Sequence, residues 1–563
     1  MNFKNISTKL ASILILVSIT VIAVFHLQTS PSESVNSEEK TFLSEETSQN
    51  RATTNKGRNE FFFKMLRDAT TNEIPRNIRA KELAFAKDLN NNVQLKGNSL
   101  VSKFNWDELG PNDVGGRTRA LGIDKRNSNI ILAGGVSGGM WKSSNGGSSW
   151  QQKSDPSDYL GVSTLIQDPS NPDTWYYGTG EIDGNSASGS GAFFHGSGIF
   201  KSTDNGESWN RVPGTEDTDT QFNSEYDFIS KIVISPTTGS MFFGSNGDGI
   251  YKSTEEGANA SLVLGAERNH FYADVEVTDS GTLYAVVSSP FSGVTPVSDD
   301  GVYMSTDDGE TWENITPSDF PNNPDRSVIG LAASNQDIFY VFTDRGFGAT
   351  GLTLFRFDVS NFPTVVSSDR SEGIANFGNP VGEMNPQGSY NLVCKVHPTD
   401  PDFVIIGTTN LQRSTNGFST IPPKDENGFT ASSQKIKYWI GGYSKSNNIS
   451  TYTNHHPDQH NIVFDPNNPK RVFSSHDGGI SVSEDITLGS VFWANRKSGY
   501  NVTQFYTVSV HPNAGDTRIM GGAQDNGSPF FRYNLSGNPS SSDDASSGDG
   551  AFAYLAQNYA LSS

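Results

Sequence analysis

The chain has 563 residues, a formal net charge of −21 and one cysteine. An excess of carboxylates of that size repels phosphate backbones, so the charge argues against a nucleic-acid partner. The single cysteine, Cys394, excludes an intramolecular disulfide framework and a cysteine-rich zinc site.

The N-terminus has the features of an export signal. Lys4 and Lys9 precede an apolar run over residues 10–25, and polar residues follow it. The run is shorter than the about 20 residues that span a bilayer, and no small-x-small cleavage site follows it. Residues 1–29 are therefore predicted to be a signal peptide or an uncleaved signal anchor. This predicts a secreted or cell-surface protein that meets the membrane only through this segment, if it stays uncleaved.

Two segments precede the main pattern. Residues 30–60 are rich in Ser, Glu, Thr and Asn, which predicts a disordered spacer. Residues 61–100 show apolar positions at roughly helical spacing on both sides of Pro75, which predicts a helical preface of two short helices packed on the main domain. These positions are Phe61, Met65, Leu66, Ile78, Leu83 and Phe85.

From residue 106 onward the composition predicts an all-β fold. The chain holds 56 Gly, 35 Phe, 18 Tyr and 8 Trp, and strands favour aromatic residues whereas the turns between them need glycine. Cys394 lies in an apolar, strand-like run over residues 390–396, which predicts a small core residue.

A turn motif, Ser/Thr-x-Asp-x-Gly-x-x-Trp, recurs along this part of the chain and is called the Asp-box below. Its Asp accepts backbone N–H groups within a tight turn, its Gly takes a positive φ, and its Trp packs on the hairpin. The motif builds a fold and is not by itself a catalytic signature. Two full copies and a third with Asn for Asp are Ser202, Asp204, Gly206 and Trp209; Ser305, Asp307, Gly309 and Trp312; and Ser143, Asn145, Gly147 and Trp150. Weaker copies begin at Ser253, Ser414 and Ser483.

A second repeat consists of an apolar strand, a turn often reading Asp-Pro-x-Asn-Pro, and another apolar strand. Clear copies contain Asp168, His397 and Asp465. About eight units of roughly 40–60 residues, each with about four short strands, are typical of propeller blades. A parallel β-helix needs shorter repeats, and a sandwich does not repeat its turn chemistry at this length.

Residues 101–547 are therefore predicted to form a β-propeller of about seven to eight four-stranded blades. Residues 548–563 are predicted to open a further blade. Because a ring does not close on half a blade, this pattern is typical of a piece of a longer protein.

Particular segments also resemble a known group of proteins. They are GPNDVGGR at 110–117, AGGVSGGMWKS at 133–143, HDGG at 476–479, GAQDNG at 522–527 and GDG at 548–550. They resemble exported bacterial proteins with BNR (Asp-box) repeats, of the sortilin-like, glycosyl hydrolase-like and xyloglucanase-related kind. The resemblance covers about residues 60–563. It implies a propeller and is poorly specific for a reaction.

The enzymes of this propeller group each require particular residues, and the sequence can be checked for them. A sialidase needs an arginine cluster and an Arg-Ile-Pro-type motif. That motif is missing, and Arg117 and Arg119 lie in a Gly-rich loop that favours a structural use. The xyloglucanase-like resemblance implies a catalytic Asp in the first blade, where this sequence has Val136, which accepts no proton. Asp113 lies near enough to substitute, although nothing positive points to it.

Three polar constellations have competing interpretations. His456, Asp458 and His460 suit calcium or a transition metal, or else form a polar loop bonded to backbone. Asp525 places a carboxylate at the central channel, or else only precedes an Asn526-Gly527 turn. Glu181 begins a long Gly/Ser insertion predicted to overhang one face.

The prediction from sequence is an exported propeller that acts as a binding or interaction module for an extracellular protein or polysaccharide. Photosystem-assembly-type and sortilin-like propellers bind proteins or peptides and need no catalytic pair, which supports this hypothesis. No cofactor is expected, with calcium or a transition metal left open. The alternative is a glycoside hydrolase that draws its catalytic acid and base from Asp477, Asp525 and Asp549.

Overall fold

The computed structural model describes residues 63–64, 67–75, 81–82, 85, 109–155, 159–181, 195–216, 223–270, 272–288, 299–322, 324–345, 351–378, 382–446, 450–533 and 541–562. Contacts divide the chain into two units, Met1–Ile78 and Arg79–Ser563. The predicted export signal and spacer lie outside the described residues. In the predicted helical preface, residues 63–64, 81–82 and 85 have helical backbone. No helix among the described residues is both long and apolar enough to cross a membrane.

The second unit is built almost entirely from four-stranded antiparallel sheets, each made of consecutive strands. The first four sheets contain β1 (Thr118–Ile123), β2 (Ile131–Gly135), β3 (Gly139–Ser143) and β4 (Gln151–Gln152); β5 (Val162–Gln167), β6 (Trp175–Thr179), β7 (Ile199–Ser202) and β8 (Asn210–Arg211); β9 (Ile229–Ile234), β10 (Met241–Ser245), β11 (Gly247–Ser253) and β12 (Ser261–His270); and β13 (Tyr272–Val277), β14 (Leu283–Ser288), β15 (Gly301–Ser305) and β16 (Glu313–Asn314).

The next four sheets repeat this order. They contain β17 (Ser327–Leu331), β18 (Ile338–Asp344), β19 (Leu352–Asn361) and β20 (Thr364–Asp369); β21 (Val393–His397), β22 (Asp400–Gly407), β23 (Leu411–Ser414) and β24 (Trp439–Gly441); β25 (Gln459–Asp465), β26 (Asn468–His476), β27 (Gly479–Ser483) and β28 (Ala494–Asn495); and β29 (Phe505–Val510), β30 (Arg518–Ala523), β31 (Pro529–Arg532) and β32 (Ser542–Asp544). A hairpin follows, of β33 (Ala553–Leu555) and β34 (Ala560–Ser562), and the described short helices are η2 (Ser371–Gly373), η3 (Ser432–Gln434) and α4 (Lys435–Tyr438).

The pattern of side chains explains why these strands pack face to face. The second strand of a sheet is apolar on both faces, as in β18, which reads IFYVFTD and is buried throughout. Such a strand needs a neighbouring sheet on each side. The outermost strands β4 and β16 have two residues each and are exposed, so they leave little free strand edge for another chain to pair with.

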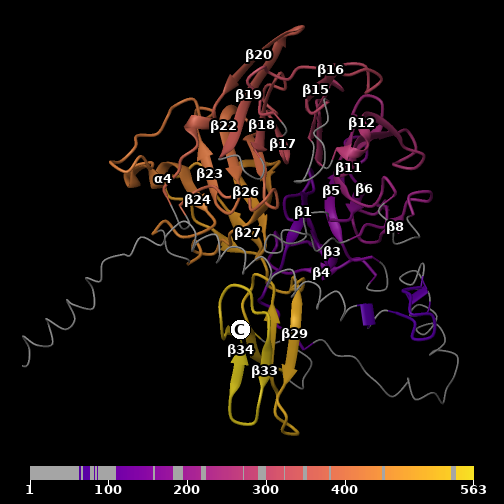
Figure 1. The fold of residues 1–563 in the computed structure, drawn as a ribbon, viewed down its shortest axis with the longest axis vertical. Helices are drawn as coiled ribbons and strands as arrows, with labels where there is room; N and C mark the ends of the chain where they lie inside the picture. The colour runs from indigo at the N-terminus through magenta and orange to yellow at the C-terminus, as the bar shows by residue number, and fades with distance from the viewer. Residues whose placement is uncertain are drawn as a thin grey trace, which may run out of the picture. The chain divides into compact units, whose positions relative to one another are not determined.

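The first seven sheets form a closed ring. Each innermost strand packs on the innermost strand of the next sheet, from β1 to β5 and onward to β25, and β25 packs on β1. Figure 1 shows the indigo β1 beside the orange β26 of the last sheet in the ring. Seven radial sheets around an axis make a β-propeller, in agreement with the predicted fold class.

The eighth sheet, β29–β32, does not join this closure, and β29 packs on β33 in the way that β1 packs on β5. The range predicted for the propeller, 101–547, therefore holds the ring and one further sheet.

A hydrophobic cluster between the first and seventh sheets completes the ring. It includes Leu121 and Trp150 from the first sheet, Phe473 from the seventh, and Tyr500 from the segment after it. The rings of Trp150 and Tyr500 lie 5.1 Å apart, and the Trp150 indole donates a 2.7 Å hydrogen bond to the Arg496 carbonyl. The tryptophan of the first Asp-box thus packs across to the last blade.

The Asp-box turns have the hydrogen bonds that their residue types predict. In the second sheet the Ser202 hydroxyl accepts from the Gly206 amide at 2.8 Å, and Asp204 accepts from the Ser208 amide at 2.9 Å. Gly206 has φ 81°, as expected. Cys394 is buried and free, as predicted.

Candidate functional site

Polar residues from several blades meet at the end of the ring where the innermost strands begin. We call this group the junction cluster. Each member lies at or within three residues of the end of a strand, and its members are Arg117, Glu181, Tyr390, Asp458, His460, Asp477 and Asp525. Asp525 follows β30 of the eighth sheet, so the cluster joins that sheet to the ring.

Arg117 is the central residue of the junction cluster. Its side chain is 1% exposed, and its guanidinium lies 3.0 Å from Glu181, 3.4 Å from Asp477 and 3.8 Å from Asp525. The guanidinium carbon also lies 4.9 Å from the centre of the Tyr390 ring, within the range of a cation–π contact. A buried charge is tolerated only with such partners, and Arg117 therefore ties three separate loops together.

Asp477 is sealed inside the cluster as a carboxylate. The Tyr390 hydroxyl donates to it at 2.6 Å, and His460 Nε2 lies 2.6 Å from its other oxygen. Burial alone would raise the pKa of Asp477, but His460 and Arg117 outweigh it and hold the pKa well below its ordinary value. Since its side chain is only 1% exposed, Asp477 is positioned to hold the cluster together and is out of reach of a large ligand.

Two neighbouring carboxyls, those of Asp525 and Asp458, have pKa values that are raised instead of lowered. Burial, followed by the charge of Asp477, raises the pKa of Asp525 to about 9. The same two causes raise the pKa of Asp458 well above its ordinary value. The Asp525 side chain is 25% exposed, so it offers a neutral carboxyl to the surface at pH 7. The pKa of Asp477 is thus lowered while those of Asp458 and Asp525 are raised, because Asp477 is paired with both Arg117 and His460 and the other two are buried beside its charge.

The backbone around the cluster is held in an uncommon conformation. Gln387, Ser389, Asp458 and Asp525 have φ between 53° and 72°, a region that residues other than glycine seldom adopt. The Asn391 side chain donates to both Gln387 and Asp458 at 2.8 Å and so locks two of these loops together. Strained positions that are over-determined in this way are typical of binding and catalytic sites.

The loop that carries Asp525 is attached to the ring by further hydrogen bonds. His456 Nε2 lies 2.9 Å from the Asp525 carbonyl, and the Asn526 amide donates to the Asp477 carbonyl at 2.9 Å. On the other side, the Asp525 backbone N–H donates at 3.0 Å to the carboxylate of Asp549, which lies between β32 and β33. Asp525 is therefore placed on the ring by contacts from both sides.

The three residues that the sequence grouped as metal ligands have different partners in the structure. His456 contacts the Asp525 carbonyl, His460 contacts Asp477, and Asp458 accepts from Asn391. No three His, Cys, Asp or Glu side chains among the described residues form a group that could hold a metal ion. The structure brings all three carboxyls named as catalytic candidates, Asp477, Asp525 and Asp549, into one neighbourhood.

The sequence predicted a structural use for Arg117 and an overhanging insertion after Glu181, and it assigned no role to Tyr390. Val136, the residue aligned with the catalytic Asp of xyloglucanase-like enzymes, is 1% exposed and only donates its backbone N–H to the Arg117 carbonyl. The linear signal that could have found Arg117 is the Gly115-Gly116 pair before it, since glycines allow the close backbone approach that surrounds this arginine.

Replacing Asp525 by Asn should make stability less dependent on pH. The folded-state pKa is about 9, above the unfolded value of about 3.9. The wild-type stability that depends on this carboxyl is therefore complete below about pH 4 and falls as the pH rises towards 9, because the folded state resists ionisation. The variant should melt at a higher temperature than the wild type at pH 8 and at a similar temperature at pH 4. If the variant and the wild type differed in melting temperature by the same amount at pH 4 and pH 8, or if the exposed control Asp279→Asn showed the same effect, the raised pKa of Asp525 would be contradicted.

Comparison with known proteins finds sequence similarity to a xyloglucanase and structural similarity to GH74 enzymes. No protein-family model matches the chain. A xyloglucanase of Paenibacillus is 25% identical over 273 residues, a match that covers 44% of this chain and 26% of that protein. The chain is similar to xyloglucanases. It spans only about a quarter of that curated relative.

Solved structures show the same fold at low identity. The GH74 xyloglucanase from Xanthomonas campestris matches with a TM-score of 0.50 and 15% identity, over 75% of this chain and 59% of that one. An ancestral GH74 enzyme matches with a TM-score of 0.51 and 18% identity, over 76% of this chain and 54% of that one. These likenesses support the propeller and say nothing of its activity.

Proposed function

We propose that the protein is an extracellular binding module that holds a neutral polysaccharide at the junction cluster. The proposal rests on one observation: Asp525 presents a partly exposed carboxyl, with its pKa raised to about 9, at the meeting point of the ring and the eighth sheet. A neutral carboxyl can both donate and accept hydrogen bonds, which suits the hydroxyl groups of a sugar. The similarity to a xyloglucanase supports a glucan as the ligand.

An aromatic side chain lies within electrostatic range of this carboxyl. Tyr443 is partly buried, and burial together with the nearby Asp458 and Asp525 raises the pKa of its hydroxyl. Aromatic rings offer a large, rigid contact face with a polar edge, which is the kind of surface on which a sugar ring packs. Asp525 and Tyr443 would together recognise one sugar unit. The export signal predicted at residues 1–29 would place this binding outside the cytoplasm.

Affinity gel electrophoresis with xyloglucan, hydroxyethylcellulose and a galactan tests this function. At least one glucan should retard the wild type, and Asp525→Ala and Tyr443→Ala should each weaken the retardation about tenfold, as expected when a hydrogen bond or ring contact is lost. Asp279→Ala and Tyr559→Ala, which alter exposed residues elsewhere, should bind like the wild type. If no polysaccharide in the panel retards the wild type, or if both site variants bind unchanged, the proposal is wrong.

A second candidate, a glycoside hydrolase, is favoured by the pairing of carboxyls. Such an enzyme needs one protonated and one ionised carboxyl across the bond that it breaks. Asp525 would be the acid. Asp477 is ionised but sealed, so the exposed Asp549, which accepts from the Asp525 amide, would have to act as the base or nucleophile.

Release of reducing sugar separates the two candidates. The binding proposal predicts no release from the three polysaccharides above. Release that disappears in Asp525→Asn, in a variant that still binds the polysaccharide, would instead establish hydrolysis. Asp279→Asn is the matched control for the loss of one carboxylate.

A further inference from the structure

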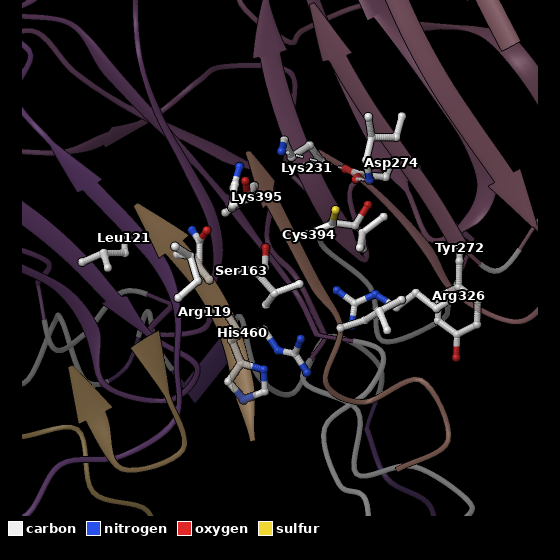
Figure 2. A pocket seen from close by; sticks show the side chains of 18 of the residues that line it. Arg119, Leu121, Ser163, Lys231, Tyr272, Asp274, Arg326, Cys394, Lys395 and His460 are labelled. Atoms are coloured by element: carbon white, nitrogen blue, oxygen red, sulfur yellow. Dashed lines mark hydrogen bonds and ion pairs between the residues drawn. The ribbon is translucent and has the colours of Figure 1, made fainter. Parts of the chain in front are cut away.

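The channel of the ring encloses a cavity of about 350 Å³ (Figure 2). Residues from all seven innermost strands line it, among them Ser163 of β5, Lys231 of β9, Asp274 of β13 and Lys395 of β21. Neither Asp525 nor Tyr443 is part of the lining. The cavity shares Glu181 and His460 with the junction cluster, but the two residues proposed above to contact polysaccharide do not line it.

Two lysines from opposite parts of the ring meet over one carboxylate. The Lys231 ammonium lies 2.7 Å from Glu276 and 4.0 Å from Asp274. The Lys395 ammonium lies 3.8 Å from the same Glu276 oxygen. Because β9 and β21 belong to sheets that are not neighbours, these side chains reach across the channel to share their partner.

Lys395 is left short of hydrogen-bond acceptors. An ammonium group has three donors, and 3.8 Å is longer than a hydrogen bond. Within the part of the chain that the structure describes, Glu276 is the one carboxylate paired with Lys395, and Lys231 holds it more closely. The charge of Lys231, followed by burial, lowers the pKa of Lys395.

Cationic side chains outnumber carboxylates around the cavity. Arg119, Lys231, Arg326 and Lys395 line it, against Glu181 and Asp274, and Glu276 adds one carboxylate beside the lysines. Figure 2 shows Lys231, Lys395 and Arg326 ending around the same space. In a chain with a net charge of −21, this channel is locally cationic.

We propose that the channel cavity binds a small oxyanion, of the phosphate or carboxylate class, with Lys395 as its principal contact. The oxygens of such an ion supply the acceptors that Lys395 lacks. Its negative charge also screens Lys395 from Lys231. Charge-assisted hydrogen bonds of this kind are the strong ones in proteins.

Thermal melting and calorimetric titration of the full chain at pH 7 and constant ionic strength test the site. Inorganic phosphate, acetate and chloride are the probes, which separates a tetrahedral oxyanion, a carboxylate and a simple halide. Phosphate or acetate should raise the melting temperature, and chloride should have little effect. Lys395→Met should weaken the binding about tenfold or more, the loss expected for one charge-assisted hydrogen bond.

A second variant moves the affinity in the other direction. Glu276→Gln removes the competing carboxylate, so it should tighten phosphate or acetate binding several-fold if the site is real. Lys252→Met is the matched control, because Lys252 pairs with Asp308 and Glu310 in an Asp-box turn away from the channel. Binding that is absent from the wild type, or that is the same in Lys395→Met and Glu276→Gln as in the wild type, would overturn the proposal. A Lys395→Met chain that does not fold leaves the Glu276→Gln result to decide it.

Discussion

The Arg117→Met variant is expected to lose about 3–5 kcal/mol of unfolding free energy, the usual cost of removing one member of a buried ion network. Arg117 is 1% exposed and contacts Glu181 and Asp477, which are themselves 3% and 1% exposed. Without the guanidinium these two carboxylates remain buried with too little positive charge around them. Methionine has a similar length and keeps most of the packing, so the loss reports on the charge.

Urea denaturation followed by tryptophan fluorescence measures this loss. Lys470→Met is the matched control, because Lys470 is 60% exposed and lies 3.6 Å from Asp485 at the surface. Exposed pairs of this kind contribute about 0–1 kcal/mol, so the control should unfold almost like the wild type. An Arg117→Met chain that unfolds together with the control would show that the junction cluster does not stabilise the ring.

The Gly115→Ala variant is expected to lose about 3 kcal/mol, because it pushes the first and last blades apart. A Cβ at residue 115 would lie 2.2 Å from the Gly478 carbonyl oxygen and 2.8 Å from its carbon. Both atoms belong to backbone, so no side chain can rotate away and the strands themselves must shift. Segment 110–117 lies at the closure of the ring, where Thr503 also donates to the Gly115 carbonyl.

Melting temperature and limited proteolysis measure the effect of this substitution. Gly489→Ala is the control, because an added Cβ there meets nothing within 4 Å. The control should keep the wild-type melting temperature and cleavage pattern, whereas Gly115→Ala should melt earlier and be cut faster. Equal melting of the two variants would contradict the close approach of residues 115 and 478.

Much of the fold could be predicted from local chemistry. Ser202 and Asp204 hold their turn through bonds to residues four or fewer positions away, so the sequence alone specifies the Asp-box. Repeated turns of this type, with strands between them, predict a propeller. The number of blades in the ring could not be predicted, because the eighth sheet has the same local pattern as the seven in the ring. Only the packing of β25 on β1 excludes it.

The candidate site was partly predictable. Asp477, Asp525 and Asp549 stood out from the sequence because each follows or lies within a Gly-rich segment at a strand end. The separate roles of these three carboxyls could not be predicted from the sequence. The pKa of Asp477 is lowered because His460 and Arg117 lie 2.6 and 3.4 Å away. The pKa of Asp525 is raised because this carboxyl is largely buried and lies near the charge of Asp477. The partners of His456, Asp458 and His460 could not be predicted from the sequence, because they lie on segments distant in the chain or depend on the folded loops around them.

By itself, the sequence determined the strands, the turns that join them and the β-propeller that their repetition implies. These properties depend on interactions over a few residues, which a linear pattern records directly. Ring closure, the charge state of each carboxyl and the cationic channel were decided only by the tertiary structure. They arise where residues far apart in the chain exclude water together, and both desolvation and Coulomb energy depend on distance in space.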